Sequence, residues 1–374
     1  MTWRSIDGFN KAFNIFISPR EPGKTDTTWW EKIYSNWLID HAPWGYLVRN
    51  VVEITQAMIQ DIEDIINKWS LTPVEFTYTK QSLKDGIVDI KIEDKLFIRI
   101  YALSIPLRRL KTAKIPNIGG LYFDEYIIDP KSGEKYLKSE AFKIKELYTT
   151  LKRSYEGRGF LKLYVTANPY SLFNPLFVDL GVPVADLRKD VYYAVSNEEV
   201  EYNFPDGTSF KDKVYKCRHN IFIGDTYAIE WGVLHPILKR WLLEKNPFYK
   251  FDETYSDYAL EGSAINDRNI KLDTLPKNFY LSFVLKVSGK IIGIFQNNYI
   301  EMLEDRYFCK FLDEVSARRT IYCFEFDEMM ERTILVSMDE RMKLQRFKEA
   351  MRKRIVSFDD INVYYYMEEV YKNL

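Results

Sequence analysis

Cysteine, histidine and long apolar runs are all scarce in this sequence. Three cysteines and three histidines in 374 residues are too few for a disulfide framework, and Cys217 with His219 supplies at most half of a metal site. The longest apolar runs are shorter than the roughly 20 residues of a membrane-spanning helix, and residues 1–4 do not open a signal peptide. We therefore expect a cytosolic protein whose thiols stay reduced and which has no membrane partner.

The sequence also lacks an excess of charge of either sign. Its 53 Lys and Arg residues balance 54 Asp and Glu residues, so any contact with nucleic acid would need a local basic face. The aromatic residues, 16% of the chain, form no repeat. With 46% hydrophobic residues, a chain of this length can bury a core and is typical of two domains.

Strands alternate with helices in the first half of the chain. Residues 12–17 suit a buried strand, and apolar residues recur at helical spacing after the loop that follows it. We expect further strands at 44–52, 74–79, 87–92, 95–102, 118–126 and 160–166, and a helix at 53–69. This alternation favours a mostly parallel sheet with helices on both faces.

The composition changes at about residue 200. Residues 206–265 are polar and rich in turn residues, so we interpret them as a connecting region with one helix near 234–243. Beyond it we expect a hairpin, a further strand and a basic helix, at 278–287 with 290–296 (continuing to 299–303), at 319–326 and at 338–355. The predicted organisation is one α/β domain at 1–205, the connecting region, and a smaller α/β domain at 266–374.

Residues 18–25 fit the phosphate-binding loop known as Walker A, except that a serine stands where the first glycine is expected. The loop consists of Ser18, Pro19, Arg20, Glu21, Pro22, Gly23, Lys24 and Thr25. In such a loop, backbone N–H groups and a helix N-terminus surround the phosphates, the lysine neutralises them, and the hydroxyl after it coordinates Mg²⁺. The two prolines each lack an N–H donor and stiffen the loop. Alone, the pattern also fits an ordinary polar turn before a helix.

Polar side chains also end the strands expected at 118–126 and 160–166. Asp124 would hold the Mg²⁺ shell together with Thr25, and Glu125 would polarise a water for attack on the γ-phosphate. Asn168 would hold that water or sense the γ-phosphate. Each pattern has a simpler alternative: a solvated strand end for the carboxylates, and a strand-to-turn Asn-Pro for Asn168. The order of all three motifs along the chain favours the nucleotide site.

Together these motifs resemble those of the DNA-packaging ATPases of small, protein-primed tailed phages, which are relatives of the large terminase subunits. The likeness is carried by Arg20 with Gly23-Lys24-Thr25, by Ile115-Pro-Asn, by Phe123-Asp124-Glu125-Tyr, and by Thr166-Ala-Asn168-Pro with Asn174-Pro175. It covers most of the first 180 residues and, more faintly, residues 278–303. The resemblance implies a P-loop NTPase core of the additional-strand, catalytic-glutamate type that uses ATP and Mg²⁺. Ser18 departs from the family pattern.

The resemblance also implies partners and further site residues. It implies a homomeric ring, a pentamer, that moves double-stranded DNA into a procapsid while docked on the portal in the host cytoplasm, with a structural RNA as a further candidate partner. The family supplies a basic residue across the subunit interface. Arg158 matches its place, with Arg153 and Lys111 as other trans candidates, and Arg20 fills the arginine position of the loop. A solvated loop arginine is the simpler alternative for Arg158, and the loop around Lys111 could instead face DNA.

The C-terminal domain raises a separate question. Large terminases carry an RNase H-like nuclease there, which needs an acidic residue in its first strand to bind two metals. Residues 279–287 contain no carboxylate, so we expect a vestigial RNase H-like domain without nuclease activity. The basic residues of 338–355 suit the phosphates of DNA or RNA, an acidic surface of the portal, or simply solvent. Two other functions stay open: a non-hydrolysing structural ring or adaptor at the portal, and a terminase with an active nuclease.

Overall fold

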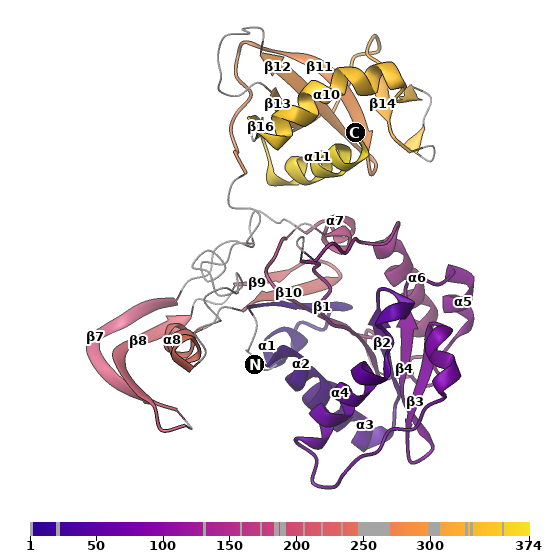
Figure 1. Cartoon of the computed structure of the whole chain (residues 1–374), viewed down its shortest axis with the longest axis vertical. Coiled ribbons are helices and arrows are strands. Elements are labelled where there is room, and N and C mark those ends of the chain that lie inside the picture. The colour runs from indigo at the N-terminus through magenta and orange to yellow at the C-terminus, as the bar shows by residue number, and fades with distance from the viewer. Residues whose placement is uncertain are drawn as a thin grey trace. The chain divides into compact units, whose positions relative to one another are not determined.

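The computed structural model describes most of the chain. The described residues are 3–19, 23–129, 132–157, 159–172, 174–182, 187, 192–204, 206–217, 220–232, 235–245, 270–297, 307–325, 328–329, 332–353 and 355–374. The chain divides into two compact units, residues 1–266 and 267–374 (Figure 1). Within the described ranges, no helix is both long enough and apolar enough to cross a membrane.

An eight-stranded sheet forms the centre of the first unit. Its order is β3-β4-β2-β5-β6-β1-β10-β9, and all neighbours are parallel except the outer pairs β3–β4 and β9–β10. The strands are β1 (Phe13–Ile17), β2 (Trp44–Val48), β3 (Ile87–Ile92), β4 (Lys95–Ala102), β5 (Gly120–Phe123), β6 (Leu163–Ala167), β9 (Asn220–Ile223) and β10 (Tyr227–Trp231). The central strands β1, β5 and β6 are buried at every residue, as strands covered on both faces should be. The predicted, mostly parallel sheet is confirmed.

The position of β6 has a direct bearing on the site. It lies between β1, which leads into the phosphate-loop motif, and β5, which leads into Asp124. The additional-strand type of core that the resemblance implies would have a strand in this place. Because the three strands are parallel, their carboxyl ends meet at one edge of the sheet, which is where open α/β sheets bind ligands.

Helices cover both faces of this sheet (Figure 1). On one face, Trp29 meets Tyr46 and Tyr122 edge to face, with ring centroids 4.9 and 5.4 Å apart. On the other face, Tyr148 stacks on Phe13 with centroids 5.4 Å apart. The helices outside the segment after the phosphate loop are α1 (Arg4–Asp7), α4 (Gln56–Asn67), α5 (Leu107–Thr112), α6 (Glu140–Lys152) and α7 (Pro175–Leu180), with short 3₁₀ turns at Val51–Glu53 and Lys80–Lys84.

The helix that follows the phosphate-loop motif has an unusual middle. It begins as α2 (Lys24–Thr27), continues as a π-helical section (Thr28–Tyr34) and ends as α3 (Ser35–Asp40). The predicted helix is confirmed, whereas the π-helical winding, a rare conformation, leaves no mark on the apolar spacing. At its start, the Thr28 hydroxyl donates to the Lys24 carbonyl (2.7 Å) and accepts the indole N–H of Trp3 (3.0 Å). The N-terminal segment is thereby tied to the first turn after the loop.

Two predictions from the sequence are wrong. The range interpreted as a connecting region with one helix, 206–265, contains three strands, and β9 and β10 extend the main sheet beyond β1. Their apolar stretches are too short, and their surroundings too polar, to show a period. Residues 74–79, expected as a strand, form only an isolated bridge between Thr77 and Lys91. The backbone N–H and C=O of Val74 bond instead to the side chain of Asn67, at 2.7 and 2.9 Å.

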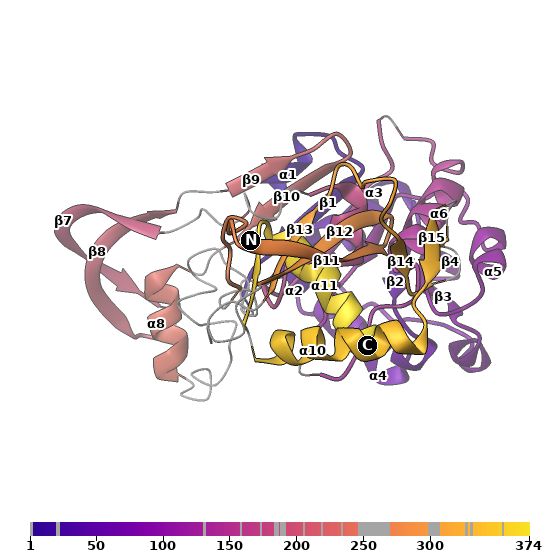
Figure 2. The ribbon, with the colours of Figure 1, turned by 90° about the horizontal axis from the view of Figure 1, so that it is seen from above.

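A two-stranded antiparallel ribbon, β7 (Tyr192–Asn203) and β8 (Ser209–Cys217), has α8 (Pro236–Lys245) beside it (Figure 2). Such a ribbon is marginally stable without further packing. Here Trp241 of α8 stacks on Phe204 with ring centroids 4.8 Å apart, and its indole N–H donates to Asp206 Oδ2 at 3.0 Å. The helix predicted near 234–243 is therefore confirmed, with the ribbon as its packing partner.

The second unit is a six-stranded sheet in the order β15-β14-β11-β12-β13-β16. Its elements are β11 (Phe279–Val287), β12 (Lys290–Asn297), β13 (Tyr307–Phe311), β14 (Ile321–Cys323), β15 (Thr333–Leu335), α10 (Met338–Arg352), β16 (Val356–Phe358) and α11 (Ile361–Asn373). The predicted hairpin is confirmed as β11–β12 and the basic helix as α10. The predicted continuation at 299–303 lies outside the described residues. Rings at Tyr307 and Phe311, four residues apart on β13, contact α10 and α11, so both helices cover one face.

The aromatic cluster around Trp29 should dominate the stability of the first unit. We expect Trp29→Ala, at a side chain 1% exposed, to lower the free energy of unfolding by about 3–5 kcal/mol, because it leaves a large cavity against the sheet. Trp69, 51% exposed, is the matched control, and Trp69→Ala should cost less than about 1 kcal/mol. Urea unfolding of both variants measures this, and equal losses would contradict the assignment.

Candidate functional site

The three sequence motifs meet at the carboxyl edge of β1, β5 and β6. The ammonium of Lys24 is the point of contact: its Nζ donates to the carbonyl oxygens of Ser18 (2.9 Å) and Pro19 (2.8 Å) and to Asn168 Oδ1 (2.9 Å). Lys24 is only 8% exposed. A buried ammonium needs such partners, because an unpaired buried charge is costly. Lys24 and Asn168, which lie 144 residues apart in the sequence, are thus in direct contact.

Asp124 is held from three directions. Thr25 Oγ1 donates to Asp124 Oδ2 at 2.9 Å, and the backbone N–H of Glu125 donates to Asp124 Oδ1, also at 2.9 Å. The Thr166 hydroxyl makes a further, short hydrogen bond to Oδ1. Hydrogen bonds to a carboxylate are stronger than neutral ones, so the orientation of Asp124 is firmly set.

The direction of donation can be followed one residue further. Because the Thr166 proton goes to Asp124, the hydrogen bond of 3.1 Å between Tyr122 Oη and Thr166 Oγ1 must be donated by the tyrosine. Burial, and then the charge of Asp124, raise the pKa of Tyr122 well above its usual value. The phenol therefore keeps its proton, and a chain of donors runs from Tyr122 through Thr166 to Asp124.

Serine at position 18 is accommodated by the neighbouring strand. Ser18 is 1% exposed, has no positive φ, and its backbone N–H donates to the Ala167 carbonyl at 3.1 Å. Gly232, which follows β10, donates its N–H to the Ile17 carbonyl. A Cβ on Gly232 would lie 2.7 Å from the Phe16 ring and 3.1 Å from the Ser18 Cβ, so the missing side chain leaves room for both neighbours. The departure from the family pattern thus has a local structural solution.

Gly23, the glycine of the phosphate-loop motif, has a backbone conformation that favours glycine. Gly23 has φ +74° and precedes the first helical residue, Lys24. A side chain there would be strained whatever the space around it. The turn at Gly23 directs the N-terminus of a helix that runs to Asp40 towards the carboxyl edge of the sheet, which is a suitable position for binding an anion.

Glu125 stands apart from the buried groups around it. Its side chain is exposed, whereas Asp124 is partly buried and Tyr126 is fully buried. Its φ is +49°, a left-handed conformation that costs a non-glycine residue on the order of 1 kcal/mol and that is frequent at functional sites. The turn leaves Glu125 exposed and Asp124 partly buried, so the two adjacent acids stand in different surroundings.

The donor set at Thr25 and Asp124 fits Mg²⁺. Their oxygens lie 2.9 Å apart, and Mg²⁺ characteristically binds one or two protein oxygens and takes its other ligands from water and phosphate. No cluster of three or more His, Cys, Asp or Glu side chains is placed to hold a metal in the part of the chain that the structure describes. Cys309 and Cys323 are buried thiols, while His219 and the Cys217 side chain lie outside the described part.

Several candidates from the sequence are not brought into this site by what the structure describes. Arg20, Glu21, Pro22 and Arg158 lie outside the described residues. Lys111 forms an ion pair with Glu146, an exposed contact between α5 and α6 of the kind that contributes little to stability. Arg153 caps the C-terminal end of α6 and is exposed. The roles of Arg158, Arg153 and Lys111 across a subunit interface stay predictions, as do those of Arg20, Glu21 and Pro22 in the nucleotide loop.

Sequence reasoning missed several residues in and around the site. Thr166 stood inside the third motif but received no role, although a period of two places it on the same side of β6 as Asn168. Tyr122 and Gly232 showed no signal, because an apolar strand hides a phenol and a single glycine has many uses. The buried pair Arg49 and Glu140, next to Tyr126, also went unnoticed.

Comparison with known proteins finds solved structures that are similar to this protein over nearly its whole length. No family model matches the sequence, and no curated protein matches it. The fold is similar to that of the phi28 gp11 DNA packaging motor, with a TM-score of 0.62, 18% identity, and coverage of 99% of this chain and 97% of that chain. It is equally similar to a chain of the bacteriophage phi29 viral genome packaging motor assembly, with a TM-score of 0.63, 15% identity, and coverage of 100% and 98%.

This chain has the fold of the phage DNA-packaging motors. The resemblance carried by the motifs is thereby confirmed for the fold, and the packaging-motor fold extends over both units rather than over the motif-bearing half alone. At these identities the likeness concerns the fold, so the chemistry of the site depends on the contacts described above.

The donor chain to Asp124 generates a prediction on Mg²⁺. Thr166→Val keeps the shape of the side chain and removes the donor, so the Mg²⁺ concentration for half-maximal binding of a fluorescent ATP analogue should rise roughly tenfold. Thr166→Ser should restore it. Thr150 is a matched control, since its buried hydroxyl bonds the Glu146 carbonyl within α6. An unchanged Mg²⁺ dependence in Thr166→Val, or the same shift in Thr150→Val, would contradict the role.

Proposed function

We propose that this chain is an ATP-driven motor that moves double-stranded viral DNA into a procapsid as a homomeric ring. One observation carries the proposal: Lys24, Asp124 and Asn168, which end or follow three different strands, meet at the carboxyl edge of a packaging-motor fold. Solvated strand ends would have no reason to converge on a buried ammonium. The portal, a structural RNA and a pentameric ring follow from the resemblance and are part of the proposal.

The residues of the site have distinct tasks in hydrolysis. The Lys24 ammonium exchanges its carbonyl contacts with Ser18 and Pro19 for phosphate oxygens, and the helix N-terminus after Gly23 adds N–H donors. Thr25 and Asp124 would hold Mg²⁺, which would supply positive charge beside the phosphates. Glu125 accepts a proton from a water whose oxygen attacks the γ-phosphorus, and the bond to ADP breaks, so that ADP and phosphate leave.

Asn168 connects the phosphate to the rest of the unit. Its Oδ1 accepts a hydrogen bond from Lys24 Nζ, so a movement of the ammonium changes a contact at the end of β6. Residues 169–180 lead from there into α7, whose N-terminus is capped by Asn174. This contact supports the proposal that Asn168 senses the presence of the γ-phosphate.

The role of Glu125 is tested by Glu125→Gln, which is nearly isosteric but cannot accept the proton. Removing a general base typically costs about 10²–10⁴-fold, so the turnover number for ATP should fall in that range while the affinity for MgATP stays within about threefold of wild type. Steady-state hydrolysis together with equilibrium binding measures both. Turnover equal to wild type would remove this mechanism, and no binding of ATP at all would favour the structural ring or adaptor.

The trans role of Arg158 is tested by mixing two inactive variants. A subunit with Arg158→Ala keeps its own nucleotide site, and a subunit with Lys24→Ala keeps its own arginine. If Arg158 acts across the interface, mixed rings contain pairs in which a Lys24→Ala subunit serves an Arg158→Ala subunit, and ATPase activity returns. Restoration with Arg153→Ala or Lys111→Ala in place of Arg158→Ala would reassign the role, and no restoration in any mixture would exclude a trans residue among the three.

In the second unit we propose a vestigial RNase H-like domain. Numbered from β11, its first five strands stand in the order 5-4-1-2-3, with the first three joined as antiparallel neighbours and the next two parallel to the first, which is the order of RNase H-like sheets. The first strand, Phe279–Val287, offers no carboxylate for a two-metal site. The basic side chains of α10 are proposed to contact DNA, RNA or the portal.

A further inference from the structure

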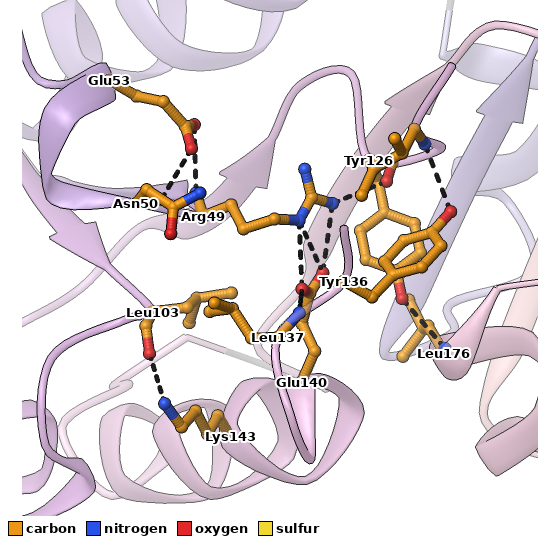
Figure 3. Close-up of polar contacts among 11 residues, drawn as sticks. Arg49, Asn50, Glu53, Leu103, Tyr126, Tyr136, Leu137, Glu140, Lys143 and Leu176 are labelled. Atoms are coloured by element: carbon orange, nitrogen blue, oxygen red, sulfur yellow. Dashed lines mark hydrogen bonds and ion pairs between the residues drawn. The ribbon is translucent and has the colours of Figure 1, made fainter. Parts of the chain in front are cut away.

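Arg49 and Glu140 form a buried ion pair beside the loop that follows β5 (Figure 3). Arg49 directly follows β2 and is 4% exposed, and Glu140, the first residue of α6, is fully buried. Arg49 Nε lies 3.0 and 3.2 Å from the two carboxylate oxygens, and Nη2 lies 3.1 Å from Oε1. The backbone N–H of Leu137 donates to Glu140 Oε2 at 2.8 Å, which fixes the carboxylate from the other side.

The guanidinium also reaches the residue after the catalytic glutamate. Arg49 Nη2 donates to the backbone carbonyl of Tyr126 at 2.8 Å. The rings of Phe123 and Tyr126 lie 5.5 and 5.9 Å from Arg49 Cζ. These two residues flank Asp124 and Glu125 in the sequence. The side chain that directly follows β2 therefore contacts the chain both before and after the two acids.

Tyr126 itself is held at three separate atoms. Its backbone N–H donates to the Thr166 carbonyl at 3.0 Å, its carbonyl accepts from Arg49, and its hydroxyl accepts the N–H of Leu176 in the first turn of α7 at 2.9 Å (Figure 3). Asp124, on the other side of Glu125, is held by Thr25 and Thr166. Glu125 thus stands in a left-handed conformation between two fixed neighbours, and the strain of that turn persists only because both are fixed.

A buried ion pair is a poor source of stability, because desolvation offsets most of its attraction. Its geometric value is larger here. A guanidinium presents a rigid fork of donors, so one group serves the Glu140 carboxylate and the Tyr126 carbonyl at once, which the single ammonium of a lysine reproduces poorly. The arrangement therefore defines a position more than it adds free energy.

From these contacts we infer that Arg49 and Glu140 are positioning residues for Glu125, acting through the carbonyl of Tyr126. The inference rests on the proposed function, in which Glu125 accepts the proton of the attacking water. The ion pair holds the turn that points the Glu125 carboxylate at that water, and the Tyr126 hydroxyl connects the same turn to α7, the helix that follows Asn168. The role assigned to Arg49 and Glu140 is indirect, because their contacts reach the turn at Tyr126 and no further towards Glu125.

The experiment compares turnover with binding in Arg49→Lys and Glu140→Gln. The lysine keeps the charge but loses the fork, and the glutamine keeps the shape but loses the charge. We expect each to lower the turnover number for ATP roughly tenfold to a hundredfold, the effect of losing a charge-assisted hydrogen bond that orients the base, with the affinity for MgATP within about threefold of wild type. Lys143→Ala is the matched control. Lys143 lies one turn further along α6 and donates to the Leu103 carbonyl at 2.8 Å, away from Tyr126, so its removal should leave turnover unchanged.

A double-mutant comparison separates positioning from a general loss of structure. If Arg49 acts through Glu125, adding Arg49→Lys to Glu125→Gln should leave the residual rate of the single Glu125→Gln variant almost unchanged. Multiplying losses would overturn the inference, as would wild-type turnover in both Arg49→Lys and Glu140→Gln, or losses of turnover, affinity and unfolding midpoint in step. Failure of the proposed function gives a different result, because Glu125→Gln would then turn over ATP as fast as wild type.

Discussion

The Lys24 ammonium is the contact on which the geometry of this site depends. It is buried, and it bonds to the two carbonyls that follow β1 and to the amide oxygen that follows β6. A buried charge is costly unless hydrogen-bond acceptors surround it. The loop after β1 and the end of β6 supply these acceptors and therefore lie close together. Asp124, at the end of the strand beyond β6, is joined to this centre by Thr25, the next residue after Lys24. One cation and its neighbour thus connect three strand ends.

The surroundings of this centre are arranged to keep it in place. Thr166 and Tyr122 orient Asp124 from within the sheet, and Gly232 makes room for Phe16 and Ser18 at the start of the loop. On the far side, the pair of Arg49 and Glu140 holds the residue after Glu125. Glu125 is the exposed acid between these fixed neighbours, as its proposed role as the base for the attacking water requires.

Much of this arrangement could be predicted from the sequence because it depends on local rules. Parallel strands bring their carboxyl ends to one edge, so the order of the motifs was enough to place Lys24, Asp124 and Asn168 together. The features that the sequence did not predict have no local sequence pattern. Arg49 and Glu140 lie 91 residues apart and join elements that no spacing relates. β10 enters the sheet beside β1 from a polar stretch, and the side chain of Asn67 takes the backbone bonds of Val74 that a strand would have used. Pairings of this kind are decided by tertiary contacts, which a one-dimensional pattern does not contain.

Equilibrium binding of a fluorescent ATP analogue, with and without Mg²⁺, tests the central claim most directly, because it examines Lys24 independently of hydrolysis, ring assembly and DNA. The account predicts saturable, Mg²⁺-strengthened binding to the wild-type chain and its loss in Lys24→Ala, whose fold should otherwise be retained. Binding that is unaffected by Lys24→Ala, or absent from the wild-type chain, would contradict it.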